Sequence, residues 1–435
     1  MKIFLDTVGC RLNQSEIETY ARQFHAAGHT LVADPAEADL AVINTCAVTS
    51  SAASDSRQKI RQAGRSGSKE IVVTGCWSSL SPEAASALPQ VRRVVPNAVK
   101  DRLVLDLLDL PAETFDLEPI ARQPIPGARL RTRAFIKVQD GCDNRCTFCV
   151  TTLARGQGRS RTVGEILADV QAAMRCDPDT LAGAQEIVLT GVHLGSWGQD
   201  FSSSMHLRHL VETILRETDV PRMRLSSLEP WDLDESFFSL WDNPRLCRHL
   251  HLPLQSGCGA TLRRMARKTT PQTFARLVAL ARAACPDLAI TTDIIAGFPG
   301  ETEAEFAETL DFVRKMNFAG GHVFTYSARP GTAAARMPDQ VAYPLRKERN
   351  ARLHADLVVS SARYQTQFLG QVVEVLWENV SELGPRFWQM SGLTDNYLRV
   401  HTLAPAHLWN QITPVKIMRH TSRGLCGEFV VDDVN

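Results

Sequence analysis

The chain has 435 residues, of which 44% are hydrophobic and 22% are charged. This composition is typical of a soluble globular protein, and the length predicts about two to four domains. Because the formal net charge is zero, the composition excludes a protein that binds nucleic acid through a global excess of positive charge.

The sequence carries no pattern typical of membrane insertion or export. No run of about 18 uncharged apolar residues occurs, and Asp6 interrupts the only apolar stretch near the N-terminus. The eleven cysteines are an odd number, which argues against complete disulfide pairing. We therefore expect reduced thiols and a cytoplasmic location.

Residues 1–110 alternate short apolar runs with helical stretches, which predicts a doubly wound parallel α/β sheet. The strands are expected at 2–6, 40–44 and 70–75, and the helices at roughly 13–27 and 48–64. The first helix is expected to open at Asn13 or Ser15.

A cysteine follows each of these three strands within a few residues: Cys10, Cys46 and Cys76. The carboxyl ends of parallel strands share one edge of a sheet, where ligands bind, so we expect the three thiols to converge. The alternative is three small apolar residues buried independently, since free cysteine is often buried.

Residues 111–132 contain four prolines and no period, which predicts a linker. Residues 133–364 then alternate strands and helices about every 30 residues, which predicts a partial (β/α)6 barrel with its site at the carboxyl ends of the strands. The strands are expected at 134–139, 186–190, 222–226, 249–254, 288–297 and 321–327, and the helices at 163–175, 205–217, 232–241, 271–284 and 302–316.

The stretch "DGCDNRCTFC" places Cys142, Cys146 and Cys149 on one loop directly after the first barrel strand. A [4Fe-4S] cluster normally binds one thiolate per iron, so three cysteines leave one iron open to another ligand. The alternative is a zinc knuckle, but no fourth Cys or His lies close downstream.

Residues 365–435 show short strands typical of a small antiparallel β-barrel. Its aromatic side chains (Trp377, Phe387, Trp388, Tyr397 and Trp409) could stack on bases, and its basic side chains (Arg399, Lys416, Arg419 and Arg423) could contact phosphates. However, the segment has five basic and seven acidic residues, so we expect several of these aromatics in the core.

Five stretches resemble the methylthiotransferases of the radical S-adenosylmethionine superfamily: "INTCAVTSSAASDSRQKIR", "VTGCWSSLSPEAASALPQV", "SSLEP", "HLHLPLQSG" and "DIIAGFPGETEAEF". The resemblance implies an N-terminal α/β domain, a radical barrel and a C-terminal TRAM β-barrel. It also implies that Cys142, Cys146 and Cys149 bind the radical cluster, and that Cys10, Cys46 and Cys76 bind an auxiliary cluster.

The mechanism that this resemblance implies uses two molecules of S-adenosylmethionine. One methylates sulfur on the auxiliary cluster, and the other is cleaved at the radical cluster to give a deoxyadenosyl radical. That radical abstracts hydrogen from the target carbon, which then takes the methylthio group.

Polar residues and glycines past the barrel strands are candidates for binding S-adenosylmethionine: Ser227, Glu229, Gln255, Gly297 and Gly300. The polar side chains could reach ribose or amino groups, and the glycines would let the backbone approach the adenine. The alternatives are an N-cap role for Glu229 and an ordinary strand-to-helix turn for the glycines.

Residues 122–161 contain nine Lys or Arg and two acids, which favours a phosphate-binding surface that includes Arg155, Arg159 and Arg161. A solvated surface loop is the alternative. The motif "VQDGCDNRCTFC", followed by "ARG" and "RSR", most resembles the branch that methylthiolates threonylcarbamoyl-adenosine in the tRNA anticodon loop.

The sequence departs from the family pattern at two places: Thr152-Leu153 replaces the usual Pro-Tyr pair, and Cys258-Gly259 replaces a Ser followed by an acid. The first departure lies in the loop beside the expected active site and therefore bears on substrate choice. Isopentenyl-adenosine in tRNA and an aspartate of a ribosomal protein are the alternative targets, and an iron–sulfur RNA-binding protein is the non-catalytic alternative. We expect tRNA and an electron-donor protein as partners, and a monomer.

Overall fold

The computed structural model describes residues 1–115, 125–126, 131–175, 183–382 and 387–430, so the predicted linker at 111–132 lies largely outside the described residues. The chain forms two compact units. The first contains Met1–Arg145, Cys149–Leu207 and Arg329–Gly331, and the second contains Cys146–Phe148, Arg208–Ala328 and Thr332–Asn435. Among the described residues, no helix has the length and apolar character needed to cross a lipid bilayer.

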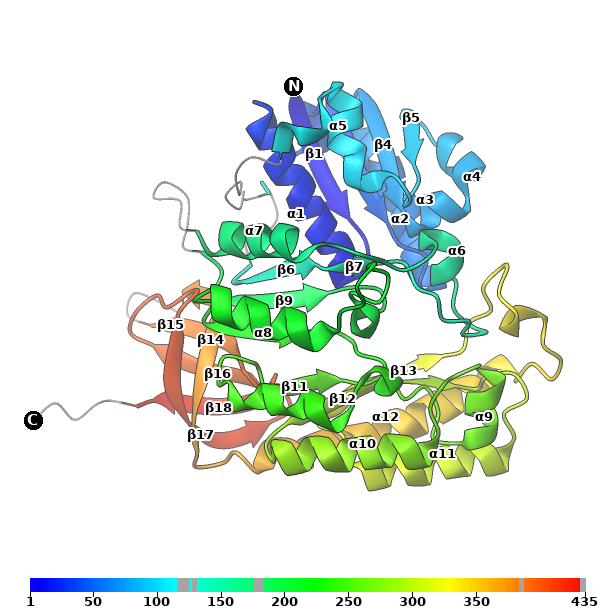
Figure 1. The fold of residues 1–435 in the computed structure, drawn as a ribbon, viewed down its shortest axis with the longest axis vertical. Helices are drawn as coiled ribbons and strands as arrows, with labels where there is room; N and C mark the ends of the chain where they lie inside the picture. The colour runs from blue at the N-terminus through cyan, green and yellow to red at the C-terminus, as the bar shows by residue number, and fades with distance from the viewer. Residues whose placement is uncertain (116–124, 127–130, 176–182, 383–386, 431–435) are drawn as a thin grey trace, which may run out of the picture. The chain divides into compact units, whose positions relative to one another are not determined.

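A five-stranded parallel sheet forms the centre of the first unit (Figure 1). In spatial order its strands are β2 (Thr30–Val32), β1 (Lys2–Thr7), β3 (Leu40–Thr45), β4 (Glu70–Gly75) and β5 (Val91–Val95). Every residue of β3 is buried, which explains its uninterrupted apolar run. The three predicted strands are confirmed, and the short or charged β2 and β5 had no comparable signal.

Helices cover both faces of this sheet, which confirms the doubly wound class. The helix α1 (Arg11–Ala26) and α5 (Leu103–Leu108) share one apolar cluster with the sheet. The helices α2 (Ser50–Ser66), α3 (Cys76–Leu80) and α4 (Pro82–Ser86) share another, on the opposite face. The chain order places the topological switch point between β1 and β3.

The helix α1 begins earlier than the sequence predicted. Its N-cap residue is Cys10, and its first helical residue is Arg11, whereas the prediction was Asn13 or Ser15. Asn13 does not cap the helix, because its side-chain amide donates to Val8 O at 2.8 Å and to Thr45 O at 3.0 Å. The prediction that Asn13 caps the helix is therefore wrong, because its side chain instead binds backbone carbonyls of the β1–α1 loop and of β3.

The remainder of the first unit contains the first two predicted barrel strands. The strand β6 (Arg133–Lys137) pairs in parallel with β9 (Glu186–Thr190), and β7 (Gln139–Asp140) pairs in antiparallel with β8 (Arg159–Ser160). The helices are α6 (Thr151–Arg155) and α7 (Val163–Met174). Thr162 and Glu165 form a capping box at the start of α7.

The second unit contains the other four predicted barrel strands: β10 (Arg222–Leu225), β11 (His249–His251), β12 (Ala289–Ala296) and β13 (Gly320–Thr325). Of these, β11, β12 and β13 form a parallel sheet. The helices are α8 (Leu207–Glu217), α9 (Gly259–Arg264), α10 (Pro271–Ala284), α11 (Glu303–Met316) and α12 (Tyr343–Thr366). The α-helix predicted at 232–241 is instead a 3-10 helix, Glu235–Asp242, which Asp234 caps.

A closed five-stranded barrel ends the described chain (Figure 1). Its strands are β14 (Val372–Glu382), β15 (Trp388–Thr394), β16 (Arg399–Ala404), β17 (Ile412–Thr421) and β18 (Gly424–Phe429). Four of its pairings are antiparallel, but β16 and β18 pair in parallel. The small barrel is therefore confirmed, and the expectation that it is wholly antiparallel is corrected.

Three arginines anchor this small barrel within the second unit. Arg222 donates to Glu374 O at 3.1 Å, and Arg224 donates to Asp395 O at 2.8 Å. Arg248 forms a bidentate ion pair with the Asp395 carboxylate, with Nε 2.6 Å from Oδ2 and Nη2 3.1 Å from Oδ1. Backbone carbonyls of the barrel thus bind the two guanidinium groups from β10, and a barrel carboxylate binds the guanidinium of Arg248, the residue that precedes β11.

Candidate functional site

Cys10, Cys46 and Cys76 follow three adjacent strands, β1, β3 and β4, at one edge of the sheet. Burial raises the pKa of the Cys46 thiol to about 11, and negative charge on Cys10 or Cys76 opposes its ionisation further. This mutual influence requires the thiols to lie near one another. The topology had predicted this convergence from strand order alone.

Two glycines allow the chain to pass close to this edge. A Cβ on Gly9 would lie 2.6 Å from Cys46 Sγ, and a Cβ on Gly75 would lie 2.3 Å from Thr45 O. Both glycines also have positive φ, at +108° and +98°, which other residues rarely adopt. A side chain at either position would displace a cysteine or the strand end that carries it.

Three thiols are the donor set that a four-iron cluster with one open iron takes. Among the described residues, no group of three His, Cys, Asp or Glu side chains is close enough to hold one metal ion. A four-iron cluster separates its ligands more widely, because each thiolate binds its own iron. Iron would have to displace the proton that the raised pKa keeps on Cys46.

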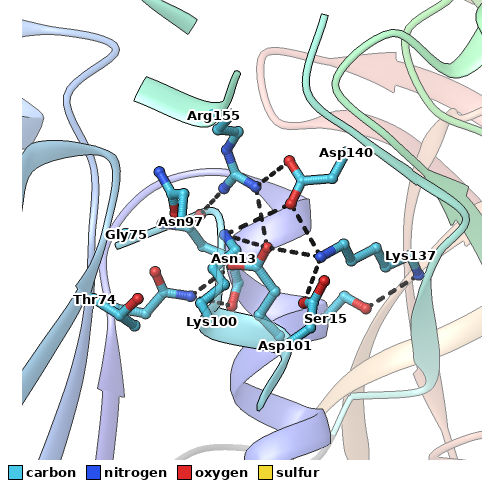
Figure 2. Close-up of polar contacts among 12 residues, drawn as sticks. Asn13, Ser15, Thr74, Gly75, Asn97, Lys100, Asp101, Lys137, Asp140 and Arg155 are labelled. Atoms are coloured by element: carbon cyan, nitrogen blue, oxygen red, sulfur yellow. Dashed lines mark hydrogen bonds and ion pairs between the residues drawn. The ribbon is translucent and has the colours of Figure 1, made fainter. Parts of the chain in front are cut away.

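Arg155 lies beside these thiols. Its Nε donates to Cys76 Sγ at 3.3 Å. Its Nη2 donates to Asn13 Oδ1 at 2.7 Å (Figure 2). Only 3% of the residue is exposed. The prediction that Arg155 contacts RNA phosphate is therefore wrong, because its donors are already used inside the protein.

Two carboxylates contact the Arg155 guanidinium, and two lysines bind these carboxylates. Figure 2 shows Arg155 with Asp140, Lys100 and Lys137. Glu16 Oε1 lies 3.1 Å from Arg155 Nη1 and 2.5 Å from Lys100 Nζ. Asp140 lies 2.8 Å from Arg155 Nη1 and 3.0 Å from Lys137 Nζ. Burial alone would raise the pKa of Glu16, but Lys100, Arg155 and Lys137 outweigh it and lower that pKa to about 2. The same cations hold the pKa of Asp140 far below its usual range against the opposing effect of burial.

The loop with Cys142, Cys146 and Cys149 begins where β7 pairs with β8. Cys142 N donates to Gly156 O at 3.0 Å, and the Cys149 thiol lies 3.1 Å from Thr151 Oγ1. All three cysteines are partly exposed. They are therefore accessible to a cofactor. Cys142 and Cys149 belong to the first compact unit, and Cys146 belongs to the second.

Within the second unit, Arg267 connects Cys146 to a predicted cofactor-binding residue. Its Nη1 lies 3.7 Å from Cys146 Sγ and 3.0 Å from Glu229 Oε1, and its Nη2 lies 2.5 Å from Glu229 Oε2. Its guanidinium also lies over the Trp231 ring, 4.5 Å from the centroid. Glu229 occupies the N-cap position of the 3-10 helix Pro230–Asp232, but its side chain makes no capping hydrogen bond there. Sequence reasoning missed Arg267, because a basic run at 263–268 gave no sign of what it binds.

Gly297 and Gly300 have a structural explanation in the turn after β12. Both have positive φ, at +72° and +75°, and a Cβ on Gly297 would lie 2.2 Å from Arg346 Cγ. Gly297 N donates to Glu301 Oε2 at 2.9 Å, and Arg349 binds the same carboxylate oxygen at 2.9 Å. The absence of a side chain at Gly297 thus leaves room for Arg346, and both glycines allow the backbone of the turn. This favours an ordinary strand-to-helix turn over a close approach of the backbone to adenine.

The remaining two cofactor candidates lie beside polar side chains from the strands. Ser227 is exposed, and its backbone forms an isolated parallel β-bridge with His251. Gln255 has a positive φ of +69°, and its backbone N donates to Asp293 O at 2.8 Å. The Asp293 carboxylate lies 3.3 Å from His251 Nε2 and 3.4 Å from His322 Nδ1. Burial opposes ionisation of Asp293, but these two imidazoles outweigh it and lower the pKa of that carboxyl. Sequence reasoning missed this His–Asp–His cluster, because three strands contribute to it.

The other two arginines of the predicted phosphate surface differ in exposure. The Arg159 side chain is 43% exposed. Arg161 is held by Asp169 at 2.6 Å and by Lys137 O at 2.9 Å. Of the three, Arg159 therefore fits a phosphate contact best.

In the C-terminal barrel, Lys416 and Arg419 are exposed, whereas Arg399 forms an ion pair with Glu378 at 2.9 Å. A β-bulge between Ile417 and Arg419 shifts the register of β17. Among the aromatics, Trp377 is fully buried, and Tyr397 stacks on His249 and under Arg224. Trp377 belongs to the core, as expected for several of the aromatics, whereas Tyr397 is partly buried and Phe387 is 51% exposed.

Two family descriptions match the chain. Residues 2–96 match "Uncharacterized protein family UPF0004", and residues 136–313 match "Radical SAM superfamily". The first match contains Cys10, Cys46 and Cys76, and the second contains Cys142, Cys146 and Cys149.

Two curated relatives and one solved structure are similar over most of the chain. A threonylcarbamoyladenosine tRNA methylthiotransferase, MtaB, of Bacillus subtilis is 37% identical over 95% of this chain and 93% of that protein. A tRNA-2-methylthio-N(6)-dimethylallyladenosine synthase of Geobacillus kaustophilus is 32% identical over 99% and 82%. The structure of the radical S-adenosylmethionine methyltransferase TsrM from Kitasatospora setae shares the fold, with a TM-score of 0.55, 16% identity and coverage of 77% of each chain. The chain therefore belongs to the radical S-adenosylmethionine methylthiotransferase family.

Proposed function

We propose that this protein converts the C2–H of threonylcarbamoyl-adenosine in the tRNA anticodon loop to C2–SCH3. The observation that carries the proposal is the 37% identity, over 95% of the chain, to the Bacillus subtilis enzyme named for that nucleoside. Two separate cysteine triplets support it, because the reaction needs both a radical source and a sulfur carrier.

The cofactors of this reaction are two [4Fe-4S] clusters and S-adenosylmethionine. When bound, they supply a carbon-centred radical and a transferable methylthio group. Cys142, Cys146 and Cys149 would hold the radical cluster, and Cys10, Cys46 and Cys76 the auxiliary cluster. Each triplet would leave one iron without a cysteine.

The charged residues of the chain position this chemistry. Arg267, fixed by Glu229 and by Trp231, places a permanent positive charge 3.7 Å from Cys146 Sγ. Such a donor stabilises a thiolate ligand. Glu229, Ser227 and Gln255 remain the proposed contacts of S-adenosylmethionine, and Gly297 and Gly300 shape the turn beside them.

The domain roles follow from the cofactors. The α/β domain (1–110) would bind the auxiliary cluster, the barrel (133–364) the radical cluster, and the TRAM-like barrel (365–435) tRNA, with Arg159, Lys416 and Arg419 exposed for phosphate. We further propose that the protein acts as a monomer in the cytoplasm, where its tRNA substrate is found. Because cleavage of S-adenosylmethionine requires an electron, we also propose a donor protein as a partner.

The second candidate substrate is isopentenyl-adenosine in tRNA, which the 32% identity to the Geobacillus kaustophilus enzyme favours less strongly. Nucleosides from a deletion strain, analysed by mass spectrometry, distinguish the two. We expect threonylcarbamoyl-adenosine to accumulate without its methylthio form, and the methylthio form of isopentenyl-adenosine to be unchanged. Loss of that second nucleoside, or of methylthio-aspartate on a ribosomal protein, would contradict the proposal.

Complementation tests the two cysteine triplets in the same strain. The wild-type gene should restore the product, and Ala at either complete triplet should not. In purified protein, Ala at Cys10, Cys46 and Cys76 should still permit deoxyadenosine formation, whereas Ala at Cys142, Cys146 and Cys149 should abolish it. Each variant should bind about four irons against about eight in the wild type; zinc in place of iron would exclude the mechanism and leave a structural RNA-binding role.

A further inference from the structure

We propose that Arg155 is a positioning residue that sets the reduction potential of the auxiliary cluster through a hydrogen bond to the Cys76 sulfur. This inference rests on the proposed assignment of Cys10, Cys46 and Cys76 as cluster ligands. Hydrogen bonds to the cluster sulfurs and the net charge around them are principal determinants of such potentials.

The geometry leaves Arg155 little freedom to point elsewhere. Its Nη1 donates to Asp140 Oδ1 at 2.8 Å and to Glu16 Oε1 at 3.1 Å, and its Nη2 donates to Asn13 Oδ1 at 2.7 Å. These three contacts fix the plane of the guanidinium (Figure 2). The Nε–H is thereby directed at Cys76 Sγ, 3.3 Å away.

Asn13 and Asn97 complete the polar contacts of the cysteines. Asn13 Oδ1, which binds Arg155, lies 3.7 Å from Cys10 Sγ. Asn97 Nδ2 lies 3.8 Å from Cys76 Sγ and donates to Ala154 O at 2.7 Å. Arg155 therefore contacts Cys76 directly and contacts Cys10 through Asn13.

The charge balance of the network favours an anionic group at the cysteines. Three cations (Arg155, Lys100 and Lys137) and two carboxylates (Glu16 and Asp140) are each 6% exposed or less. Lys137 has a further partner in Asp101, at 2.7 Å, whose side chain is 66% exposed and lies at the edge of the network. The buried members alone thus carry one excess positive charge, and Arg155 is the cation that reaches sulfur. A cluster bound to thiolates would supply the compensating negative charge.

The chain position of Arg155 connects this site to the other cysteine loop. Arg155 ends α6, which begins two residues after Cys149, and Asp140 precedes Cys142 by two residues. The Arg155–Asp140 ion pair therefore joins the two ends of the loop that would carry the radical cluster. One guanidinium contacts both the ends of that loop and a ligand of the auxiliary cluster.

A redox titration separates this role from a purely structural one. The background is the full chain with Cys142, Cys146 and Cys149 replaced by Ala, so that electron paramagnetic resonance reports the auxiliary cluster alone. In that background we compare Arg155→Met with the unchanged arginine. At a fixed solution potential, the ratio of reduced to oxidised cluster should fall about tenfold in Arg155→Met, which is about 59 mV for a one-electron couple.

The matched control is Arg159→Met in the same background. Arg159 Nη2 lies 4.0 Å from Asp140 Oδ2, and its side chain is 43% exposed. Arg159→Met removes a nearby charge without removing a hydrogen-bond donor to sulfur. At the same solution potential, the ratio of reduced to oxidised cluster should therefore stay within about twofold of that in the background protein. An equal shift in both variants would show that general charge, and not the hydrogen bond, acts on the cluster.

The failure of this inference and the failure of the proposed function give different results. If the background protein with Arg155 intact binds no four-iron cluster, the ligand assignment is wrong. If the cluster is bound and Arg155→Met leaves its potential unchanged, the inference is overturned. Should Arg155→Met not fold, Arg155→Lys keeps the charge but loses the Nε–H donor; a smaller shift in the same direction supports the inference, and no shift overturns it.

Discussion

At the scale of single residues, the charged side chains near the cysteines are buried rather than solvated. The sequence analysis placed Arg155 on a surface because it lies in a basic stretch, but the structure surrounds it with Glu16 and Asp140. Glu16 belongs to none of the motifs in the sequence. Local sequence could not reveal the contact between Glu16 and Arg155, because the two residues are 139 positions apart.

Glu16→Gln should change how stability depends on pH. The pKa of Glu16 is lowered from an ordinary 4.5 to about 2. Because the folded-state pKa is depressed, the ionised carboxylate stabilises the fold above about pH 4.5, and this contribution is lost as the pH falls towards 2. Removing one partner of a buried ion pair costs about 3–5 kcal/mol.

We therefore expect Glu16→Gln to lower the melting temperature strongly at pH 7 and progressively less towards pH 3. Glu37→Gln is the matched control, because the Glu37 side chain is 57% exposed in a surface pair with Lys2. That change should cost less than about 1 kcal/mol. A Glu16→Gln deficit that is constant with pH would show that the carboxylate is not held ionised by its neighbours.

At the scale of elements, the close approach of β3 and β4 positions two of the cysteines. Gly75 ends β4, and the backbone of Thr45 at the end of β3 occupies the space where a side chain would lie. Cys46 and Cys76 are the residues that come next in the chain. The glycine therefore determines how near the two cysteines come.

Gly75→Ala should destabilise the protein more than Gly67→Ala. Both glycines have positive φ, at +98° and +107°, but nothing lies within 4 Å of the Cβ position at Gly67. Gly67→Ala should cost about 1–2 kcal/mol from the backbone alone, and Gly75→Ala about 1–3 kcal/mol more from overpacking. Thermal melts and iron content measure the difference; equal melting temperatures for the two variants would refute the steric explanation.

The elements also show where sequence patterns suffice. Buried parallel strands such as β3, β4 and β9 have apolar runs that specify them, and the strand order then predicts that Cys10, Cys46 and Cys76 meet. The start of α1, the 3-10 helix at Glu235–Asp242 and the parallel pairing of β16 with β18 depend on tertiary contacts. Arg267 and the His251–Asp293–His322 cluster depend on residues from several strands, so no local pattern could reveal them.

At the scale of the whole molecule, a chain of zero net charge must bind tRNA through local surfaces. Lys416 and Arg419 are exposed on β17, whereas Arg155 and Arg161 are held by carboxylates. Of the three arginines expected from the sequence to contact phosphate at 154–161, Arg159 is therefore the one whose side chain is exposed for that role. The C-terminal barrel is the better candidate for phosphate contact.

Lys416→Glu with Arg419→Glu should weaken tRNA binding and flatten its salt dependence. Each lost phosphate contact lowers the slope of log affinity against log salt by about 0.7–1. Lys2→Glu with Lys69→Glu is the control, because these lysines lie at the amino ends of β1 and β4, opposite the cysteines. Filter binding over a salt series measures both, and identical slopes for wild type and the Lys416/Arg419 variant would remove this barrel from the tRNA-binding surface.

The three arginines that anchor the C-terminal barrel determine how the protein can be dissected. Arg222, Arg224 and Arg248 bind carbonyls and a carboxylate of that barrel. A chain shortened before the barrel would remove these partners of the guanidiniums and uncover Tyr364 and Phe368, which pack in the same apolar cluster as the barrel core. The barrel is therefore an integral wall of the second unit rather than a detachable module, and swapping it between relatives requires that residues 222–248 be exchanged with it.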